Sequence, residues 1–261
     1  MKYLIIRPLE ETDMDEMFVA FNEAFSTYAV NMQMNRADFD RRTRHKIHID
    51  FAASVGAFDD QKLVGFIFHN LSSYEGTLAA YNGGTGVIPI YRGHGLVKRM
   101  YDHIRIPLIE RGVKKCVLEV LQSNLQAQKS YEHCGFSKSK DFQCMVLTTI
   151  RSRQIPKDVQ ILEASSFDLK AYREVAPPAM NMLDQLETIL HHWPHEMVLE
   201  ARKQNNLVGF LIFQPSSGRI SHLATAKNHR KRGIATALLS AAFQKCHKPK
   251  MSVLNINSEN L

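Results

Sequence analysis

The chain has 261 residues, a formal net charge of +7, 44% hydrophobic residues and 23% charged residues. This length accommodates two domains of ordinary size, and the composition is typical of a soluble globular protein. No apolar run reaches the length of a membrane span, and the apolar start at residues 3–6 is too short for a secretion signal. We therefore expect a cytoplasmic protein without a membrane partner.

The positive charge favours anionic ligands. Five basic residues cluster between Arg36 and Lys46, but no aromatic residues interleave with them and no nucleic-acid motif accompanies them. We expect a solvated helix face there, with an acidic ligand as the alternative, and no nucleic-acid partner. The four cysteines lack metal or redox spacing, which predicts free, buried thiols in a reducing compartment. They are Cys116, Cys134, Cys144 and Cys246.

The first part of the chain alternates strand and helix patterns. Apolar periodicity predicts helices near 12–25, 36–51, 96–108 and 124–134. Period-two or continuous apolar runs predict strands at 3–7, 54–58, 63–70, 77–88, 115–121 and 142–148. Pro107 is expected to kink or shorten its helix because proline cannot donate the backbone hydrogen bond.

The second part starts at about Val159 and repeats the same order. Helices are predicted near 167–175 and 178–191. Strands are predicted near 197–203, 207–214, 219–226 and 251–256.

Three pairs of segments show that the chain is duplicated. Matching segments are 62–68 with 206–213, 85–96 with 223–235, and 117–120 with 253–256. Offsets between matched positions are similar, about 140 residues, so we predict two copies of one domain, at 1–150 and 151–261. The second copy is incomplete, because Leu261 aligns with Leu125 and the last part of the first copy has no counterpart. A truncated record and an open-ended domain both remain possible explanations.

Each copy contains a short strand, then an arginine, a glycine-containing turn and an amphipathic helix. The first copy of this turn has Arg92, Gly93 and Gly95, and the second has Arg230 and Gly233. A helix start leaves backbone N–H groups without intrahelical partners, and the helix dipole adds positive potential there. Both turns are therefore predicted to bind a phosphate or pyrophosphate.

These residues resemble the signature of the GNAT acyltransferase superfamily, R/Q-x-x-G-x-G/A followed by N-x-x-A-x-x-x-Y-x-x-x-G-F. The first copy has Arg92 to Val97, where Val97 replaces the expected small residue. It continues with Asn124, Ala127, Tyr131 and Gly135-Phe136. The second copy matches fully at 230–235. The resemblance covers nearly the whole chain and implies two tandem GNAT-like α/β domains, the second incomplete. Each would be a mixed β-sheet flanked by helices, with two splayed parallel strands.

The resemblance also implies that acetyl-CoA lies in the splay and that no metal is needed. In the first copy, its binding residues would be Gly86, Val87, Ile88, Arg92, Gly93, His94, Gly95, Leu96, Val97 and Asn124. In the second copy, they would be Arg230, Arg232, Gly233, Ile234 and Ala235.

Acyl transfer to an amine needs a base, an oxyanion donor and an acid for the leaving thiolate. Glu119 is the lone charge in an apolar run, which favours a raised pKa and a role as base. Tyr131, twelve residues later, is the acid candidate, because the family places a Glu and a Tyr at these relative positions. The backbone N–H of Val87 or Ile88 would bind the oxyanion. Structural roles for both side chains, and water or another residue as base, remain alternatives.

Other candidates fit the chemistry less well. Glu75 lies in an apparent exposed turn, and His94 is better placed for ligand contact than for catalysis. The run 191–195 holds three histidines, but Pro194 interrupts helical spacing and no carboxylates complete a metal site. Because Asn255 occupies the position of Glu119, we expect catalysis in the first domain.

We therefore expect an N-acetyltransferase that joins acetyl-CoA to a small-molecule or peptide amine. The alternative is a catalytically inactive CoA-binding or protein-interaction module with the same fold. A dinucleotide-binding enzyme fits the sequence poorly, because the chain lacks G-x-G-x-x-G and an acidic residue placed to bind a ribose. The acceptor and the oligomeric state stay open.

Overall fold

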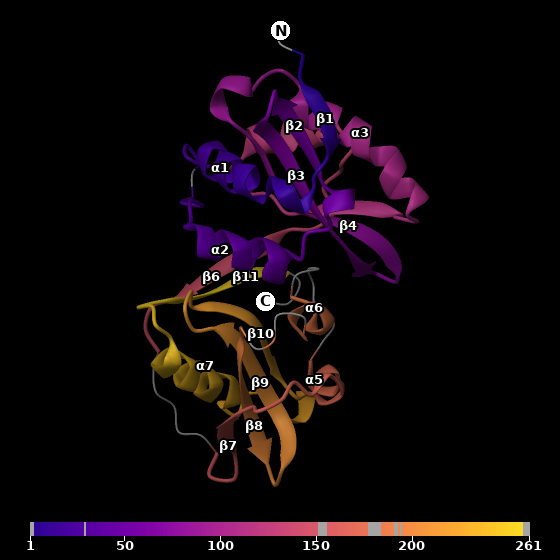
Figure 1. Ribbon diagram of the computed structural model, residues 1–261. Coiled ribbons are helices and arrows are strands. Elements are labelled where there is room, and N and C mark those ends of the chain that lie inside the picture. Colours follow the sequence, from indigo (N-terminus) through magenta and orange to yellow (C-terminus); the bar gives the residue numbers. More distant parts are fainter. Residues whose placement is uncertain are drawn as a thin grey trace. The chain divides into compact units, whose positions relative to one another are not determined.

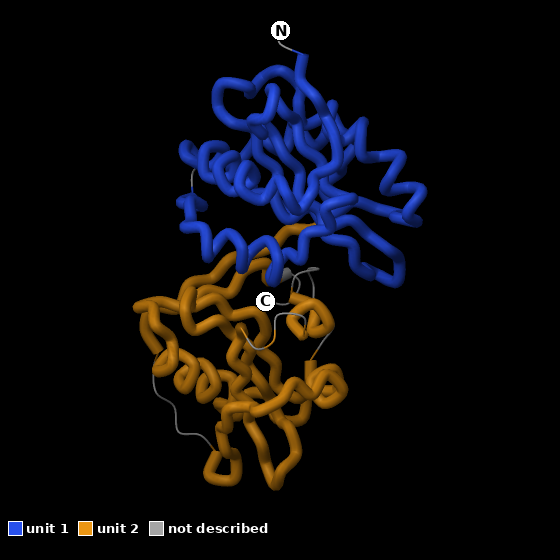
Figure 2. Tube along the Cα trace, viewed as in Figure 1, with its two compact units in different colours: residues 1–138 blue, residues 139–261 orange. Residues whose placement is uncertain are grey.

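The computed structural model describes residues 3–28, 30–150, 156–176, 184–190, 193 and 195–257. The chain divides into two compact units, Met1–Lys138 and Ser139–Leu261, coloured separately in Figure 2. Each unit contains a mixed β-sheet flanked by helices (Figure 1). The division falls after Lys138, twelve residues before the boundary predicted from the repeat.

Unit 1 has a five-stranded sheet in the order β1-β2-β3-β4-β5. Its strands are β1 (Ile5–Pro8), β2 (Val55–Asp59), β3 (Lys62–Tyr74), β4 (Thr77–Val87) and β5 (Lys115–Leu118). Neighbouring strands are antiparallel except for β4 and β5, which are parallel. The helices are α1 (Met14–Ala24), α2 (Arg36–Asp40), α3 (Leu96–Glu110) and α4 (Leu125–Glu132).

Unit 2 has a six-stranded sheet in the order β6-β11-β10-β9-β8-β7. Its strands are β6 (Phe142–Leu147), β7 (Gln160–Glu163), β8 (Met197–Lys203), β9 (Asn206–Gln214), β10 (Arg219–Thr225) and β11 (Met251–Asn257). The helices are α5 (Leu169–Val175), α6 (Leu186–Leu190) and α7 (Ile234–Lys245). Again, only the pair β10 and β11 is parallel.

The repeated Val-Gly-Phe sequence explains why both sheets are covered on two faces. A Cβ at Gly65 would lie 3.4 Å from Met100 on α3, and Phe66 packs on Phe21 of α1 with ring centroids 6.1 Å apart. Successive strand residues point to opposite faces, so α1 and α3 cover opposite faces of the sheet.

Unit 2 repeats this arrangement. A Cβ at Gly209 would meet Ile234 of α7 at 3.1 Å, whereas the ring of Phe210 lies 4.7 Å from that of Tyr172 on α5. The glycine therefore lets α7 approach one face of the sheet, and the phenylalanine fills the other face. This equivalence supports the duplication inferred from the sequence.

Strand β6 belongs to the second sheet, although the repeat assigned it to the first domain. It pairs antiparallel with β11 from Phe142↔Asn257 to Leu147↔Met251. Its apolar alternation predicted a strand correctly, but periodicity carries no information about which edge a strand will join. With β6 in place, β11 lies between two strands and is not an edge of its sheet.

The segment predicted as one helix over 36–51 consists of several pieces. After α2, residues Arg41–Ile47 form a π-helix, which ends at His48 with a left-handed φ of 55°. The Thr43 hydroxyl donates to the Phe39 carbonyl at 2.8 Å, a local bond that competes with regular helix.

The basic side chains of this segment form ion pairs on the surface of unit 1. The pairs are Arg36 with Asp15 and Asp40, Arg41 with Asp38, and Arg44 with Glu11. Much of the local positive charge is therefore balanced by neighbouring carboxylates, and exposed pairs of this kind contribute little to stability.

Helix α3 continues through Pro107 to Glu110, beyond the predicted interruption. Proline lies in the last turn of the helix, where its missing N–H costs a single hydrogen bond. The four cysteines are free; three are half-buried and Cys144 is exposed, so the expectation of buried thiols fails for Cys144.

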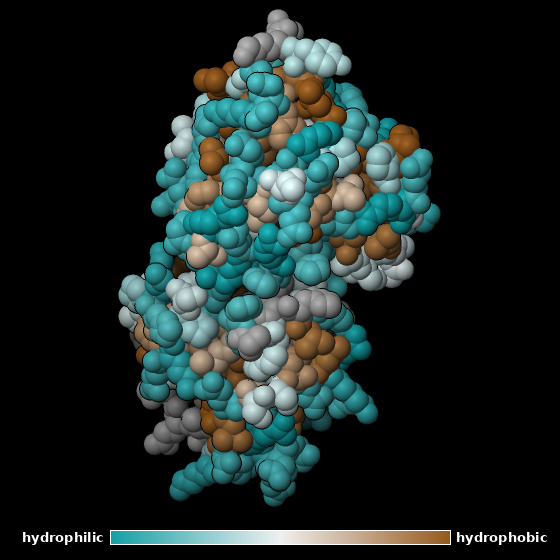
Figure 3. Space-filling view, viewed as in Figure 1, coloured by the Kyte–Doolittle hydropathy of each residue, from teal (hydrophilic) through white to brown (hydrophobic). Residues whose placement is uncertain are grey.

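Hydrophilic residues cover most of the face drawn in Figure 3, with hydrophobic residues scattered among them. Within the described ranges, no helix is long and apolar enough to cross a membrane.

Candidate functional site

The candidate site of unit 1 begins where β4 and β5 separate. The two strands pair only from Ala79↔Lys115 to Asn82↔Leu118. Strand β4 then continues from Gly83 to Val87 along β3. One backbone edge of this last part of β4 therefore pairs with β3. The other edge faces the side on which β5 no longer pairs.

Hydrogen-bond alternation shows which backbone groups lie on that second edge. The Ile88 N–H donates to the Val64 carbonyl at 3.0 Å, so residues 88 and 64 form a hydrogen-bonded pair. In an antiparallel ladder, the neighbouring pair is not hydrogen-bonded. The N–H of Val87 consequently points away from β3. Of the two predicted oxyanion donors, Val87 has the suitable direction and Ile88 does not, because its N–H is already used.

Gly86 is explained by packing against α1. A Cβ at this position would lie 2.4 Å from the Phe66 ring and 2.9 Å from the Ala24 methyl. Any larger residue would force β4 away from α1. Glycine therefore keeps this part of β4 close to the helix.

The predicted phosphate turn follows the end of β4. Gly93 and Gly95 have left-handed φ values of 81° and 67°, and a Cβ on either would have no atom within 4 Å. Glycine is needed there for its backbone conformation and not for space. His94 lies between them and is exposed.

Helix α3 starts at Leu96 with Gly95 as its N-cap. No side chain of the described chain caps it, and its first turn contains no acidic residue. The first intrahelical bond shown for this end runs from the Arg99 N–H to the Gly95 carbonyl at 3.1 Å. Because the preceding N–H groups have no partner four residues back, this end of α3 can bind an anion.

Side chains at the start of α3 anchor the turn to the core. Leu96 is buried, with 3% of its surface exposed, and Val97 packs at the edge of the same core. The valine that departs from the family signature is thus accommodated by apolar contacts, and the binding of an anion by backbone groups does not require a smaller residue.

Arg92 has a structural task in addition to any ligand contact. Its guanidinium donates to the Val87 carbonyl at 3.0 Å, the Ala24 carbonyl at 2.7 Å and the Thr27 hydroxyl at 3.1 Å. These bonds join the end of β4 to the end of α1. Several of its donors are therefore already engaged within unit 1.

The turn of unit 2 reproduces much of this geometry. Arg230 donates to the Thr225 carbonyl at 3.2 Å, as Arg92 does to Val87. Gly233 is the left-handed N-cap of α7, with φ of 83°. Lys231 replaces Gly93 but keeps a left-handed φ of 59°, so this turn holds a side chain in a strained conformation.

The remaining predicted residues of this turn differ in exposure. Ile234 is buried at 1% and packs in the core of unit 2, Ala235 is half-buried, and Arg232 is exposed. Asn255, at the position of Glu119, has a left-handed φ of 60° within β11.

Glu119 lies directly after β5 and is half-buried. The predicted strand 115–121 was too long, because pairing with β4 ends at Leu118 and Leu121 is 37% exposed. Glu119 therefore lies outside the paired strand, and its role as base stays a prediction.

Asn124 caps α4, as the sequence predicted: its Oδ1 accepts the Ala127 N–H at 3.1 Å. Its Nδ2 donates to the Tyr28 hydroxyl at 3.4 Å. One asparagine thus fixes the start of the helix that carries Tyr131 and links it to the chain after α1.

Tyr131 lies near the end of α4, with its ring 5.8 Å from that of Phe136. The Phe136 N–H donates to the Tyr131 carbonyl at 3.1 Å, and Gly135 has a left-handed φ of 92°, so the chain turns back at this point. Burial raises the pKa of Tyr131, while the Thr85 side chain opposes this rise. A protonated phenol held beside β4 is suited to give a proton.

Sequence reasoning missed Thr85 and Asn82 of β4, and Thr85 acts on the pKa of Tyr131. The Asn82 amide donates to the Thr85 hydroxyl at 2.6 Å and to the Tyr101 hydroxyl at 2.7 Å. A polar residue within an otherwise apolar strand was the available signal, since a buried amide needs several partners.

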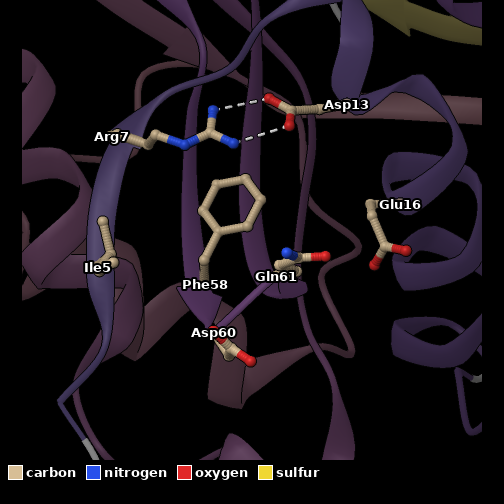
Figure 4. Close-up of a pocket in the computed structure, with 7 residues that line it drawn as sticks. All are labelled: Ile5, Arg7, Asp13, Glu16, Phe58, Asp60 and Gln61. Atoms are coloured by element: carbon tan, nitrogen blue, oxygen red, sulfur yellow. Dashed lines mark hydrogen bonds and ion pairs between the residues drawn. The ribbon is translucent and has the colours of Figure 1, made fainter.

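A separate surface hollow of unit 1 is shown in Figure 4. Arg7 forms two hydrogen bonds of 2.8 Å with Asp13, and its guanidinium lies 4.0 Å above the Phe58 ring. Both bonds hold the first strand against the start of α1. The residues of this hollow are Ile5, Arg7, Asp13, Glu16, Phe58, Asp60 and Gln61. Because Arg7 and Asp13 are engaged with each other, we assign this pair a structural role.

Among the described residues, no group of three or more His, Cys, Asp or Glu side chains could hold a metal ion. His191, His192 and Pro194 of the histidine-rich run lie outside the described residues.

Comparison with known families gives one match in each half. The acetyltransferase (GNAT) family matches residues 12–136, and an acetyltransferase (GNAT) domain matches residues 163–260. No curated protein matches the chain.

Three solved structures resemble nearly the whole chain. A GCN5-related N-acetyltransferase from Sphaerobacter thermophilus has a TM-score of 0.74 at 16% identity, with 99% of this chain and 88% of that chain covered. A tandem GNAT protein from the clavulanic acid biosynthesis pathway has a TM-score of 0.69 at 12% identity, with 97% and 90% covered. The glucosamine N-acetyltransferase region of a fungal multi-domain β-N-acetylglucosaminidase has a TM-score of 0.71 at 14% identity, with 98% and 36% covered. At these identities the likeness establishes the fold alone.

Proposed function

The chain belongs to the GNAT acetyltransferase family, with two domains in tandem, and on this premise we propose that it transfers an acetyl group from acetyl-CoA to a primary amine. We further propose that the reaction takes place in unit 1. The observation that supports this best is the separation of β4 from β5 after Asn82, next to a helix start without a side-chain cap.

In this proposal, the pyrophosphate of acetyl-CoA binds the N–H groups at the start of α3, and its pantetheine arm lies along the free edge of β4. The Val87 N–H, which points away from β3, donates a hydrogen bond to the thioester oxygen as its negative charge develops. The exposed turn of Gly93, His94 and Gly95 gives the phosphates access from solvent.

The amine attacks the thioester carbon directly while both substrates are bound. Glu119, or a water molecule next to it, takes a proton from the amine. When the tetrahedral intermediate collapses, the carbon–sulfur bond breaks and its electron pair stays on sulfur. Tyr131 then gives its proton to the thiolate, and the phenolate regains a proton from solvent.

Unit 2 is proposed to bind CoA weakly or to serve the acceptor site. It keeps the arginine and the left-handed glycine of the turn. However, it has Asn255 in place of Glu119, so the base is missing there.

The proposal is tested by mixing the protein with acetyl-CoA and a panel of amines, and measuring the free thiol of CoA. The panel contains a polyamine, an aminoglycoside, several amino acids and a peptide with a free N-terminus. Because Cys144 is exposed, a reaction without acetyl-CoA gives the thiol background of the protein. We expect thiol release that depends on one class of amine. Release of the CoA thiol with none of these amines would contradict the proposed acetyltransferase activity and favour an inactive CoA-binding module.

A further inference from the structure

Arg92 holds the backbone of β4 at the residue where the thioester is proposed to bind. Its Nε donates to the Val87 carbonyl at 3.0 Å. The Ile88 N–H, which belongs to the same peptide unit, donates to the Val64 carbonyl on β3 at 3.0 Å. This peptide unit is therefore hydrogen-bonded at both ends, to β3 on one side and to Arg92 on the other.

Both backbone groups of Val87 lie on the edge of β4 that faces away from β3. In an antiparallel ladder, the N–H and C=O of one residue point to the same edge, and those of a residue two positions away do so as well. The backbone groups of Thr85 and Val87 therefore face the side on which β5 no longer pairs. At Thr85 this edge presents a donor and an acceptor, whereas at Val87 the acceptor is occupied by Arg92.

This difference between the two residues matches the two kinds of carbonyl group in acetyl-CoA. An amide of the pantetheine arm has an oxygen that accepts and an N–H that donates, so it pairs with an edge residue that presents both backbone groups. A thioester has an oxygen that accepts and no N–H. An edge residue with an N–H and an occupied carbonyl therefore suits a thioester better than an amide.

The bond from Nε recurs in the second copy of the turn. In unit 2, Arg230 Nε donates to the Thr225 carbonyl at 3.2 Å, and the Ala226 N–H donates to the Val208 carbonyl at 2.9 Å. The signature that these turns resemble accepts arginine or glutamine at this position. Nε of arginine and Nε2 of glutamine are both bonded to Cδ, so either side chain can place an N–H at the same point. Arginine and glutamine thus share a donor at this point and not a positive charge.

The rest of the Arg92 guanidinium fixes its orientation. It donates to the Ala24 carbonyl at 2.7 Å and to the Thr27 hydroxyl at 3.1 Å, both at the end of α1. Because the guanidinium is a rigid planar fork, these two bonds keep Nε directed at Val87.

We infer that Arg92 is a positioning residue that sets the register of acetyl-CoA along β4. By occupying the Val87 carbonyl, it excludes a pantetheine amide from this residue and reserves the Val87 N–H for the thioester oxygen. This inference rests on the proposed function, because it takes this edge of β4 as the site of the pantetheine arm. Without the donor at Nε, an amide can pair with Val87, and acetyl-CoA binds with its thioester displaced.

The kinetic test compares Arg92→Gln, which can place an N–H at the same point, with Arg92→Met, which has a chain of similar length and no donor. With the acceptor found in the amine panel, kcat of Arg92→Met should be about 10- to 100-fold below that of Arg92→Gln, because the thioester is misplaced. The Kd of acetyl-CoA should be similar in the two variants. Equal kcat values, together with an equal and salt-dependent loss of affinity in both variants, would overturn the inference, because Arg92 would then bind the phosphates through its charge.

The hydrogen bond to Val87 can be observed by NMR without an acceptor amine. The chain contains a single Val-Ile dipeptide, Val87-Ile88. Protein labelled with ¹³C at the valine carbonyl and with ¹⁵N in isoleucine therefore gives one amide signal coupled to ¹³C. Loss of a hydrogen bond moves a carbonyl carbon upfield, so the Val87 carbonyl signal should move upfield in Arg92→Met and stay near the wild-type position in Arg92→Gln. An unchanged signal in Arg92→Met would overturn the inference.

Two controls accompany this measurement. The Ile88 amide signal in the same spectrum shows whether β3 and β4 still pair in each variant, because the Ile88 N–H donates to Val64. Arg230→Met removes the corresponding bond in unit 2 and should leave the Val87 carbonyl signal unchanged.

The position of the thioester is tested by comparing acetyl-CoA with CoA, which lacks the thioester oxygen. Protein labelled with ¹³C at the glycine carbonyl and with ¹⁵N in valine gives signals for the two Gly-Val dipeptides, Gly86-Val87 and Gly112-Val113. In the wild type and in Arg92→Gln, the Val87 amide signal should shift more with acetyl-CoA than with CoA. In Arg92→Met this difference should disappear. The same difference in Arg92→Met as in the wild type, or no difference in the wild type, would overturn the inference.

The proposed function and the role of Arg92 fail separately. Absence of turnover with every amine would contradict the proposed function, whereas the Val87 signals still decide whether Arg92 sets the register of bound acetyl-CoA.

Discussion

Replacing Gly95 by Glu tests whether the N-terminus of α3 binds the pyrophosphate. A Cβ at Gly95 meets no atom within 4 Å, so the new side chain fits sterically. The left-handed φ of 67° costs about 1–2 kcal/mol of stability with any non-glycine residue. Gly95→Gln bears the same strain at nearly the same size but has no charge, and it is therefore the matched control.

The magnitude follows from Coulomb's law. A carboxylate about 5 Å from a phosphate charge repels it by about 0.8 kcal/mol in water and by about 3 kcal/mol at an effective dielectric constant of 20. Gly95→Glu should thus bind acetyl-CoA about 4- to 150-fold more weakly than Gly95→Gln. The difference should shrink as salt concentration rises, since salt screens exposed charges.

The assay is calorimetric titration of acetyl-CoA into the intact chain, read for affinity and stoichiometry. The same pair of substitutions at Gly233 probes α7, which starts with an equivalent left-handed glycine. We expect loss of the tighter site only in the Gly95→Glu variant. Equal affinities for Gly95→Glu and Gly95→Gln would refute the reasoning that places the pyrophosphate at α3.

Three further predictions concern pH and stability. Burial lowers the pKa of His69 to about 4, so the unfolding free energy should be highest above pH 6.5 and fall by up to about 3 kcal/mol toward pH 4. Urea titrations at several pH values should show a flatter dependence of the unfolding free energy on pH for His69→Gln than for the wild type. Identical dependences in the two proteins would contradict a neutral buried imidazole. Burial opposes ionisation of Asp13, but bonds from Arg7 outweigh it and lower the pKa, so this pair stabilises above about pH 3.8 and its contribution is lost in more acidic solution. Asp13→Asn should lower the unfolding free energy, measured by urea titration at pH 7, by about 2 kcal/mol. The substitution Asp15→Asn, at an exposed ion pair, should lower it by less than about 0.5 kcal/mol. Equal losses would count against the stabilising role assigned to the two hydrogen bonds between Arg7 and Asp13. Glu119→Gln should lower kcat and flatten the acid side of the dependence of kcat on pH. A wild-type dependence would assign the role of base to water or to another residue.

The fold was predictable from the sequence to a large extent, because its evidence is local. The repeated glycine turn, the Val-Gly-Phe strand and the Asn124 cap each depend on backbone geometry or on the packing of a few neighbours. They recur in the structure as left-handed glycines, a two-sided sheet and a capped helix. The family matches confirm the tandem GNAT arrangement.

The features that escaped prediction depend on tertiary context. Strand β6 joins β11 in the second sheet, and no periodicity specifies a pairing partner. The strand containing Cys116 ends at Leu118 because β4 and β5 separate, although the apolar run continues. The helical pattern after α2 gives way to a π-helix at Arg41–Ile47, which a regular 3.6-residue period cannot indicate.

The candidate site was predictable in its backbone elements and less so in its side-chain network. Glycines before a helix start predict an anion site, because the backbone N–H groups there lack intrahelical partners. Two hydrogen bonds join Asn82 to Thr85 on β4 and to Tyr101 on α3, and only the folded chain brings these residues together. The Ile88 N–H and the Arg92 guanidinium already donate hydrogen bonds within unit 1, which the sequence could not show.

The most direct test of the central claim is a single-turnover measurement with the acceptor amine found in the panel. Wild-type protein and Tyr131→Phe are each saturated with acetyl-CoA and mixed rapidly with the amine, and the acetylated product is quantified. Tyr3→Phe serves as the control, because Tyr3 is 92% exposed. We expect at least a tenfold slower transfer in Tyr131→Phe, at unchanged acetyl-CoA affinity. Equal rates in all three proteins would contradict the assignment of acetyl transfer to the Tyr131 site of unit 1.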